Sequence, residues 1–214
     1  MSSNQPTVFV VDDDRSICES LQLLVQSAGW QVQTFQTGEA FLCAPAVAGP
    51  SCLVLDLMLP DLSGLDVQRL VATRADMPII FISGHTDVPS TVQAIKAGAV
   101  EFLTKPFSVD LLLDAIAGAL ERSRSELARA AELRALEDSY RSLTPREQAV
   151  MGLVVSGRLN KQVGGELGIS EITVKAHRGK LMRKMHAHSL PELVLMAARL
   201  CLTPRSAERM ARMP

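Results

Sequence analysis

The sequence predicts two domains: a doubly wound α/β domain with a five-stranded parallel sheet, followed by a small all-α domain whose four helices include a helix-turn-helix. Three observations lead to this prediction. Short β-branched runs alternate with helical patterns in the first half of the chain, whereas the second half contains only helical patterns. A length of 214 residues also suits two small domains.

Five short apolar or β-branched segments are expected to form the sheet. They are residues 8–11, 31–35, 52–56, 78–83 and 101–104. The first, third and fourth segments are nearly all apolar, as expected when helices cover both faces of a parallel sheet. The clearest helix follows the first strand, has one apolar face and is expected to end at Gly29. That face consists of Ile17, Leu21, Leu24, Val25 and Ala28.

The rest of the chain is helical. A long stretch from about 108 to 140 is expected to be the last helix of the first domain running into a helical linker; a dimeric coiled coil and a solvated linker are alternatives for its second part. Thr144, Pro145 and Glu147 mark the start of the next helix as N-cap, first and third residues. Further helices are expected around 160–167, 171–186 and 190–200, with Gly168 and Ser170 at the turn between the first two.

These patterns give the domain limits. We expect the first domain at 1–121, a helical linker at 122–141, the helix-turn-helix domain at 142–203 and a C-terminal tail at 204–214.

The two parts of the chain carry opposite net charge. Residues 1–141 contain 10 Lys and Arg against 18 Asp and Glu, a net charge of -8, whereas residues 142–214 contain 12 against 5, a net charge of +7. A basic domain suits a polyanion such as nucleic acid, and clustered carboxylates in an acidic domain suit a metal cation.

The cellular location is expected to be the cytoplasm, without a membrane partner. No apolar run is long enough to span a membrane, and the polar start lacks the parts of a signal peptide. The four cysteines occur singly in apolar segments and are expected to be reduced core thiols. They are Cys18, Cys43, Cys52 and Cys201.

Aspartates follow two of the predicted strands. Asp12, Asp13 and Asp14 come after the first strand, and Asp56 ends the third. If these strands are neighbours, the carboxylates converge, and their repulsion calls for a cation such as Mg²⁺. Asp14 is expected instead to cap the first helix. Asp56 needs a partner that the end of a buried strand would not otherwise supply.

Two further polar residues lie at matching strand ends, Ser83 after the fourth strand and Lys105 after the fifth. Together with Asp56 they would form a phosphoryl-transfer site, in which the aspartate is the nucleophile and the other two bind phosphoryl oxygens. A cis peptide bond between Lys105 and Pro106 would direct the lysine inward. The alternatives are a surface lysine in a turn and a serine that caps a helix.

Roughly the first 120 residues resemble the receiver domains of response regulators. The motifs VVDDD, DLMLPDLSG, ISGH and AGAVEFLTKPF occur in the order and spacing of that family. The resemblance implies Asp12 and Asp13 as the acidic pair, Asp56 as the phosphorylated residue and the Met58 backbone carbonyl as a Mg²⁺ ligand. It further implies that Ser83 takes the hydroxyl position, Lys105 the lysine position and Phe102 the aromatic-switch position. Position 83 is serine where threonine is commoner, and the hydroxyl is kept.

The helix expected at 171–186 would be the recognition helix of the helix-turn-helix. Its inward stripe consists of Val174, His177, Leu181 and Met185, and its outward side of Thr173, Lys175, Arg178, Gly179, Lys180 and Arg183. Because the outward side is cationic, most of its side chains are expected to contact phosphate, and two or three to read bases. A solvated basic helix is the alternative.

The segments LTPRE, NKQV, LGIS, TVKAH and the later KM resemble the LuxR-type helix-turn-helix. The two resemblances together imply a transcription regulator of the NarL/FixJ class. The expected DNA contacts are Lys161, Thr173, Lys175, Arg178 and Lys180. One departure is the pair Gly164 and Gly165, since each mid-helix glycine costs about 1 kcal/mol relative to alanine. Close backbone packing would justify Gly164; nothing accounts for Gly165.

The expected function is phosphorylation-dependent transcription regulation in a two-component system, without enzymatic turnover. A sensor histidine kinase would phosphorylate Asp56, and the chain would then form a homodimer and bind promoter DNA, with RNA polymerase as a further candidate partner. The alternative is a DNA-binding module whose receiver serves only as a dimerisation scaffold. Two other classes of protein do not fit. A haloacid-dehalogenase-like hydrolase would need a second aspartate at the position of Met58. An FMN-binding flavodoxin-like domain would bind the FMN phosphate after the first strand, where the three aspartates 12–14 would repel it.

Overall fold

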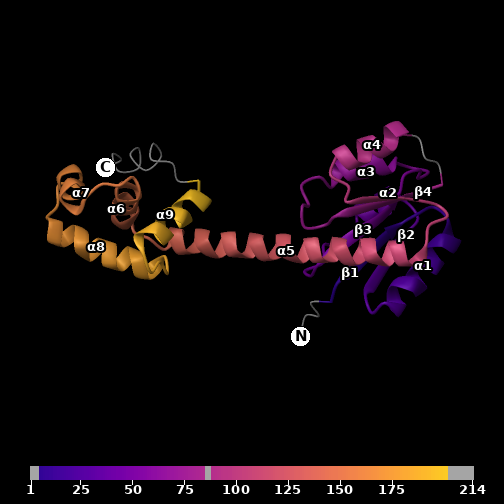
Figure 1. Cartoon of the computed structure of the whole chain (residues 1–214), viewed down its shortest axis with the longest axis horizontal. Helices are drawn as coiled ribbons and strands as arrows, with labels where there is room; N and C mark the ends of the chain where they lie inside the picture. The colour runs from indigo at the N-terminus through magenta and orange to yellow at the C-terminus, as the bar shows by residue number, and fades with distance from the viewer. Residues whose placement is uncertain (1–4, 85–87, 202–214) are drawn as a thin grey trace. The chain divides into compact units, whose positions relative to one another are not determined.

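The computed structural model describes residues 5–84 and 88–201, and the chain divides into two compact units between Ala128 and Arg129. The first unit contains a five-stranded parallel sheet in the order β2-β1-β3-β4-β5 (Figure 1). The strands are β1 Thr7–Val11, β2 Gln31–Phe35, β3 Ser51–Asp56, β4 Ile79–Ser83 and β5 Glu101–Thr104. The doubly wound α/β prediction is confirmed, and every predicted strand is correct to within one residue at each end.

Helices cover both faces of this sheet (Figure 1). They are α1 Arg15–Ser27, α2 Gly38–Leu42, α3 Gly64–Leu70, α4 Val88–Lys96 and α5 Val109–Arg141. Alternate residues of a strand point to opposite faces, so Val8 and Val10 of β1 pack with α1 and α5. Phe9 and Val11 pack with α2, α3 and α4 on the other face. Each such buried side chain contributes about 1.5–3 kcal/mol, and together they fix the strand ends that carry the acidic residues.

The ends of α1 are those that the sequence predicts. Asp14 is the N-cap, and its carboxylate accepts a hydrogen bond from the Ser16 backbone N–H. The helix stops before Gly29, whose φ of +84° lies in the left-handed region that glycine adopts without strain. Asp14 therefore shapes the start of a helix, and its carboxylate is occupied there.

The second unit is all helical. Its helices are α6 Pro145–Val155, α7 Asn160–Leu167, α8 Glu171–Lys184 and α9 Leu190–Arg199. The predicted capping box at Thr144 and Glu147 is present, with both reciprocal hydrogen bonds. Gly168 has a φ of +68° and Ser170 caps α8, as expected of the turn in a helix-turn-helix. The predicted four-helix architecture is confirmed.

The two adjacent glycines of α7 have different surroundings. A Cβ atom at Gly164 would lie 2.7 Å from the carbonyl oxygen of Ile169, so the close packing expected there is present. A Cβ at Gly165 would meet nothing within 4 Å, and nothing in the structure explains that glycine.

The cysteine prediction is half correct. Cys18 and Cys52 are buried, and burial raises the pKa of the Cys52 thiol to about 12. Cys43 and Cys201 are exposed, because the first caps the C-terminus of α2 and the second follows α9. None of the helices that the structure describes is both long and apolar enough to be a membrane span. The tail expected at 204–214 lies outside the described residues.

Candidate functional site

The residues predicted at the strand ends lie along one edge of the sheet. Val11 of β1 pairs with Leu55 of β3. The residues that follow them, Asp12 and Asp56, are therefore neighbours. Between β4 and β5, Ser83 pairs with Thr104, and Lys105 follows. The parallel register therefore gathers residues that lie far apart in the sequence.

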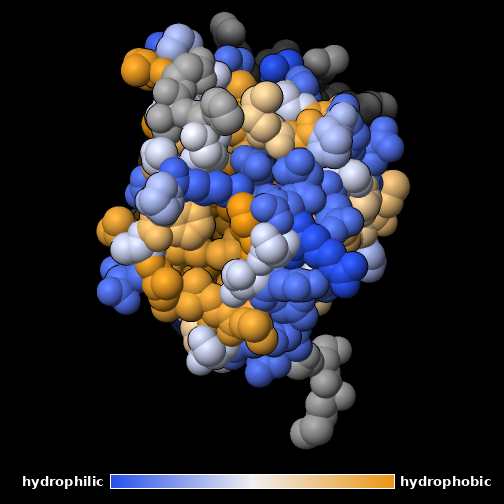
Figure 2. Space-filling model, turned by 90° about the vertical axis from the view of Figure 1, so that its right-hand side faces the viewer, coloured by the Kyte–Doolittle hydropathy of each residue, from blue (hydrophilic) through white to orange (hydrophobic). Residues whose placement is uncertain are grey.

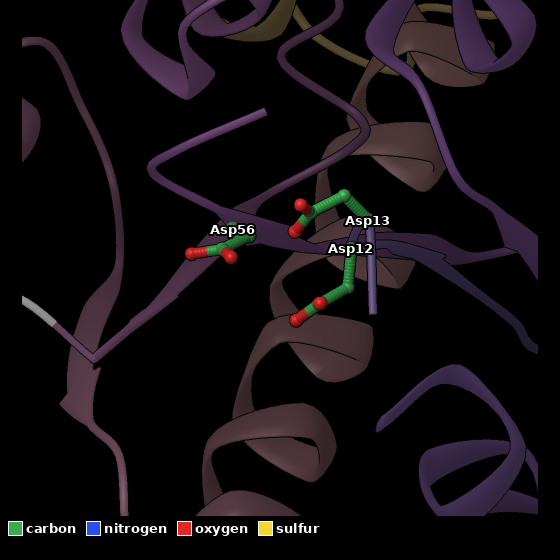
Figure 3. A group of neighbouring side chains, drawn as sticks. All are labelled: Asp12, Asp13 and Asp56. Atoms are coloured by element: carbon green, nitrogen blue, oxygen red, sulfur yellow. The ribbon is translucent and has the colours of Figure 1, made fainter. Parts of the chain in front are cut away.

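Three carboxylates form a cluster that we call the acidic pocket: those of Asp12, Asp13 and Asp56 (Figure 3). One oxygen of each lies within 4.8 Å of the others. Asp12 is fully buried and Asp56 is 7% exposed, whereas Asp13 is exposed. Figure 3 shows the side chains of Asp12 and Asp13 extending toward the side on which Asp56 lies.

Lys105 is the cation at this pocket. Its Nζ donates to Asp12 Oδ2 at 2.6 Å and to Asp56 Oδ2 at 3.3 Å, and the Lys105–Pro106 peptide bond is cis. Burial raises the pKa of the Asp12 carboxyl even though Lys105 and the Asp14 N–H act to lower it. Burial also disfavours the charged lysine, but the hydrogen bond and charge of Asp12, with the charge of Asp56, outweigh it and raise the pKa of Lys105.

The donor set of the acidic pocket fits a hard divalent cation. Three carboxylates face one lysine, so the pocket carries excess negative charge when all three are ionised. Their oxygens are the ligands that Mg²⁺ prefers, and the exposure of Asp13 leaves room for water. Asp12, Asp13 and Asp56 would hold the ion.

The loop after β3 is held in place by two features that sequence reasoning did not single out. A Cβ atom at Gly64 would collide with the Asp56 carbonyl oxygen and the Phe81 ring, so only glycine permits this approach. The Asp61 carboxylate accepts hydrogen bonds from two backbone N–H groups at the start of α2, at 3.1 and 2.8 Å. Met58, whose backbone carbonyl is the further expected ligand, lies in this loop with its side chain 64% exposed.

Ser83 and Phe102 lie on neighbouring strands. Ser83 is 1% exposed at the end of β4. The Phe102 ring is half-buried and stacks on Phe81 with a centroid separation of 6.1 Å. Because Phe81 and Ser83 are two residues apart on one strand, their side chains share a face of the sheet.

An apolar groove of about 390 Å³ borders the pocket at Lys105. Its other lining residues come from α1 and from the start of α5, namely Ser16, Ile17, Ser20, Leu21, Leu24, Pro106, Phe107 and Val109. Figure 2 views this side of the first unit and shows apolar surface next to hydrophilic surface. A macromolecule that reaches Asp56 from this side would meet apolar surface beside the charged site.

The outer side of α8 differs in part from the prediction. Lys175, Gly179, Lys180 and Arg183 are exposed as expected, and Lys161 on α7 is exposed too. Thr173 and Arg178 are half-buried instead, and each has a hydrogen-bonding partner in an adjoining segment. Thr173 Oγ1 lies 2.8 Å from Ser170 Oγ, and Arg178 Nη1 donates to Asn160 Oδ1 at 2.6 Å.

Three other residues of α8 are exposed that the sequence analysis did not single out: Glu171, Ile172 and Ala176. They lie three or four residues before Lys175, Gly179 and Lys180, so helical spacing alone places them on the same side. That spacing could have identified them.

The end of α8 is anchored by an ion pair between a half-buried lysine and a buried glutamate. Lys184 Nζ donates to Glu147 Oε2 at 2.7 Å and to the Ser142 carbonyl oxygen at 2.9 Å. Glu147 is 3% exposed and also accepts from the Thr144 backbone N–H. Lys184 thus serves packing between α6 and α8.

Two family models match the chain. The model described as the response regulator receiver domain matches residues 8–117, and that of the bacterial regulatory proteins of the luxR family matches residues 141–197. Nodulation protein W of Bradyrhizobium diazoefficiens is 46% identical over 209 residues, covering 97% of this chain and 92% of that protein. Transcriptional regulatory protein FixJ of Rhizobium meliloti is 39% identical over 192 residues, covering 89% and 94%.

Solved structures agree with these matches. The response regulator StyR has a TM-score of 0.79 and 46% identity, covering 91% of this chain and 99% of that chain. Full-length FixJ from B. japonicum has a TM-score of 0.53 and 36% identity, covering 92% and 98%. A receiver domain joined to a LuxR-type DNA-binding domain implies a histidine kinase and DNA as partners. The chain belongs to the two-component response regulators of the NarL/FixJ class, transcription regulators that join a receiver domain to a LuxR-type DNA-binding domain.

Proposed function

We propose that Asp56 accepts a phosphoryl group from a sensor histidine kinase, and that the phosphorylated chain dimerises and binds promoter DNA. The observation that carries this proposal is a buried carboxylate at a strand end with two further carboxylates and one lysine around it. A charge arrangement of this kind is costly to bury and is useful when a metal ion and a phosphoryl group enter.

In the transfer step an Asp56 carboxylate oxygen attacks the phosphorus of a kinase phosphohistidine. The new P–O bond forms as the P–N bond breaks, and the electron pair of that bond stays on the imidazole nitrogen. Bound Mg²⁺ would neutralise charge on the attacked group, with Met58 proposed to add its backbone carbonyl to the three carboxylate ligands.

Lys105 and Ser83 orient the phosphoryl group. The Lys105 Nζ, at 3.3 Å from Asp56 Oδ2, is close enough to bind an oxygen of a phosphoryl group on that carboxylate. The Ser83 hydroxyl, buried at the neighbouring strand end, donates to another oxygen.

Ser83 and Phe102 carry the change to the surface of the first unit. Movement of Ser83 toward the phosphoryl group alters packing on the face that Phe81 and Phe102 share. This face adjoins α4, where Val88, Val92 and Ile95 are exposed at helical spacing. The α4 and β5 surface is the proposed dimer contact, because dimerisation would bury these apolar side chains.

In the second unit, the proposed DNA contacts come from two helices of the helix-turn-helix. They are Lys161, Thr173, Lys175, Arg178 and Lys180. Their charges would neutralise phosphates, and two copies of the unit would bind adjoining half-sites. RNA polymerase is the further partner that a DNA-bound dimer would contact.

The test compares wild type with Asp56→Asn after incubation with acetyl phosphate and Mg²⁺. Mass spectrometry measures phosphorylation, sedimentation measures dimerisation, and titration with DNA measures affinity. Wild type should gain one phosphoryl group, dimerise and bind DNA more tightly, whereas Asp56→Asn should show none of these changes. Glu39→Gln, which removes an exposed carboxylate of α2, away from the proposed dimer contact, is the matched control and should behave as wild type.

If wild type and Asp56→Asn bind DNA equally well under both conditions, the receiver acts only as a scaffold and the proposal is wrong. Phosphorylation that persists in Asp56→Asn would assign the acceptor to another residue.

A further inference from the structure

Near its N-terminus, the recognition helix α8 exposes a line of apolar residues to solvent. Ile172, Ala176 and Gly179 follow at intervals of four and three residues and are all exposed. Ile172 is 80% exposed, the largest exposed fraction among the large hydrophobic side chains that the structure describes. Its side chain therefore contributes little to the core of the second unit.

Three polar side chains beside the first two turns of this line have partners within the unit. Lys175 pairs with Glu171 at 3.2 Å, Thr173 pairs with Ser170, and Arg178 is held by Asn160. The first two turns of α8 thus expose apolar surface between side chains that already have hydrogen-bonding partners.

The chemistry of the DNA major groove limits what such a surface can recognise. In a helix-turn-helix the first residues of the recognition helix reach the base edges. The C5 methyl group of thymine is the apolar group displayed there, and apolar side chains contact it. Bidentate readout of guanine needs a free arginine or lysine in the first turns of the recognition helix. Lys175 and Arg178 there already have partners, and Gly179 has no side chain.

We propose that Ile172, together with Ala176, contacts thymine methyl groups in the major groove and so makes the protein specific for A·T pairs at the positions that the start of α8 faces. This inference rests on the proposed DNA binding. Ile172 is then a specificity-determining residue, whereas the lysines of the helix-turn-helix supply affinity for any sequence.

The test replaces thymine by uracil, which removes the C5 methyl group and keeps base pairing. The full chain, treated with acetyl phosphate and Mg²⁺, first selects its preferred duplexes from random DNA. Each thymine of a selected half-site is then replaced singly, and dissociation constants are measured at one fixed salt concentration. The proteins compared are wild type, Ile172→Ala, Ile172→Val and Leu23→Ala.

Leu23→Ala is the matched control, because Leu23 is 69% exposed and lies on α1 of the first unit. At one or two positions, uracil should weaken binding of wild type and of Leu23→Ala by about fourfold, the fold-change that corresponds to about 0.8 kcal/mol for one buried CH₂ or methyl group. The same replacement should leave Ile172→Ala nearly unaffected. Ile172→Val keeps a branched apolar side chain and should retain most of the sensitivity.

Equal sensitivity of wild type and Ile172→Ala at every position would overturn the inference, as would a half-site in which no thymine is sensitive. Both results would leave DNA binding itself intact. A full chain that enriches no sequence at all would instead contradict the proposed function, and this inference with it.

Discussion

Each unit of the chain places a lysine against buried carboxylate, but the two sites differ in charge balance. In the second unit, Lys184 faces the single carboxylate of Glu147. That carboxylate also accepts a backbone hydrogen bond, and its lysine donates to a carbonyl oxygen as well. In the first unit, Lys105 faces Asp12 and Asp56, with Asp13 beside them.

The difference indicates what each site is for. One lysine and one carboxylate with further hydrogen bonds are balanced, and removing either leaves the other without compensation. One lysine among three carboxylates is short of positive charge until a cation binds, so its arrangement suits a ligand better than it suits stability. Substituting a carboxylate should therefore have opposite consequences in the two units.

The largest effect on stability is expected for Glu147→Ala. It breaks the ion pair with Lys184 and removes the capping box, so unfolding of the second unit should require about 3 kcal/mol less free energy. The chain has one tyrosine, Tyr140, which packs on the core of the second unit, and one tryptophan, Trp30, which packs in the first. Chemical denaturation followed at both residues separates the two transitions, and only that of Tyr140 should shift.

Glu132→Ala is the control for Glu147→Ala. Glu132 pairs with Arg199, but the two side chains are 66% and 49% exposed, so the loss should stay below about 1 kcal/mol. Equal losses for the two variants would show that the pair of Glu147 and Lys184 stabilises the unit no more than a surface pair does.

Asp12→Asn should have the opposite character. Removing one carboxylate relieves repulsion in the acidic pocket, so the Trp30 transition without Mg²⁺ should not move to lower denaturant concentration. Affinity for Mg²⁺ should fall by at least about tenfold, or about 1.4 kcal/mol, because the ion loses a charged ligand. Isothermal titration of the whole chain measures the affinity, and Asp114→Asn should leave it unchanged.

A loss of stability in Asp12→Asn as large as in Glu147→Ala would remove the distinction between the two sites. Asp12 would then act as a structural residue of the first unit, like Glu147 in the second.

The strand ends and the acidic pocket could be predicted because they depend on local patterns and one general rule. Parallel strands end at one edge, so aspartates after two apolar runs and a lysine after a third had to meet there. The capping box at Thr144 was predictable for a similar reason, since both partners lie within one helical turn.

Contacts between distant residues could not be predicted. Ser123 is fully buried and accepts a hydrogen bond from the Ser51 backbone N–H, 72 residues away, so the packed part of the first unit extends into the segment expected to be linker. Arg178 was expected to face outward, but its partner Asn160 lies 18 residues earlier, on another helix. Helical spacing gives the side of a helix and says nothing of such partners.

The smallest of the expected effects on stability is that of acidification on the ion pair of Glu147 and Lys184. Burial alone would raise the pKa of Glu147, but the hydrogen bonds from Lys184 and from the Thr144 N–H, with the charge of Lys184, outweigh it and lower that pKa from its ordinary 4.5. The folded second unit therefore releases this proton more readily than the unfolded chain. Stability from the ionised Glu147 is complete above about pH 4.5 and is lost as the pH falls through the folded pKa.

The expected loss at the Tyr140 transition is about 1 kcal/mol, less than for Glu147→Ala, because a protonated glutamate still accepts hydrogen bonds. Glu147→Gln keeps those acceptors and cannot titrate, so its Tyr140 transition should lack this part of the pH dependence. If wild type and Glu147→Gln lose stability in parallel below pH 4.5, other carboxylates dominate acid unfolding of the second unit. The ion pair with Lys184 would then owe its stabilising effect to shape and hydrogen bonding more than to charge.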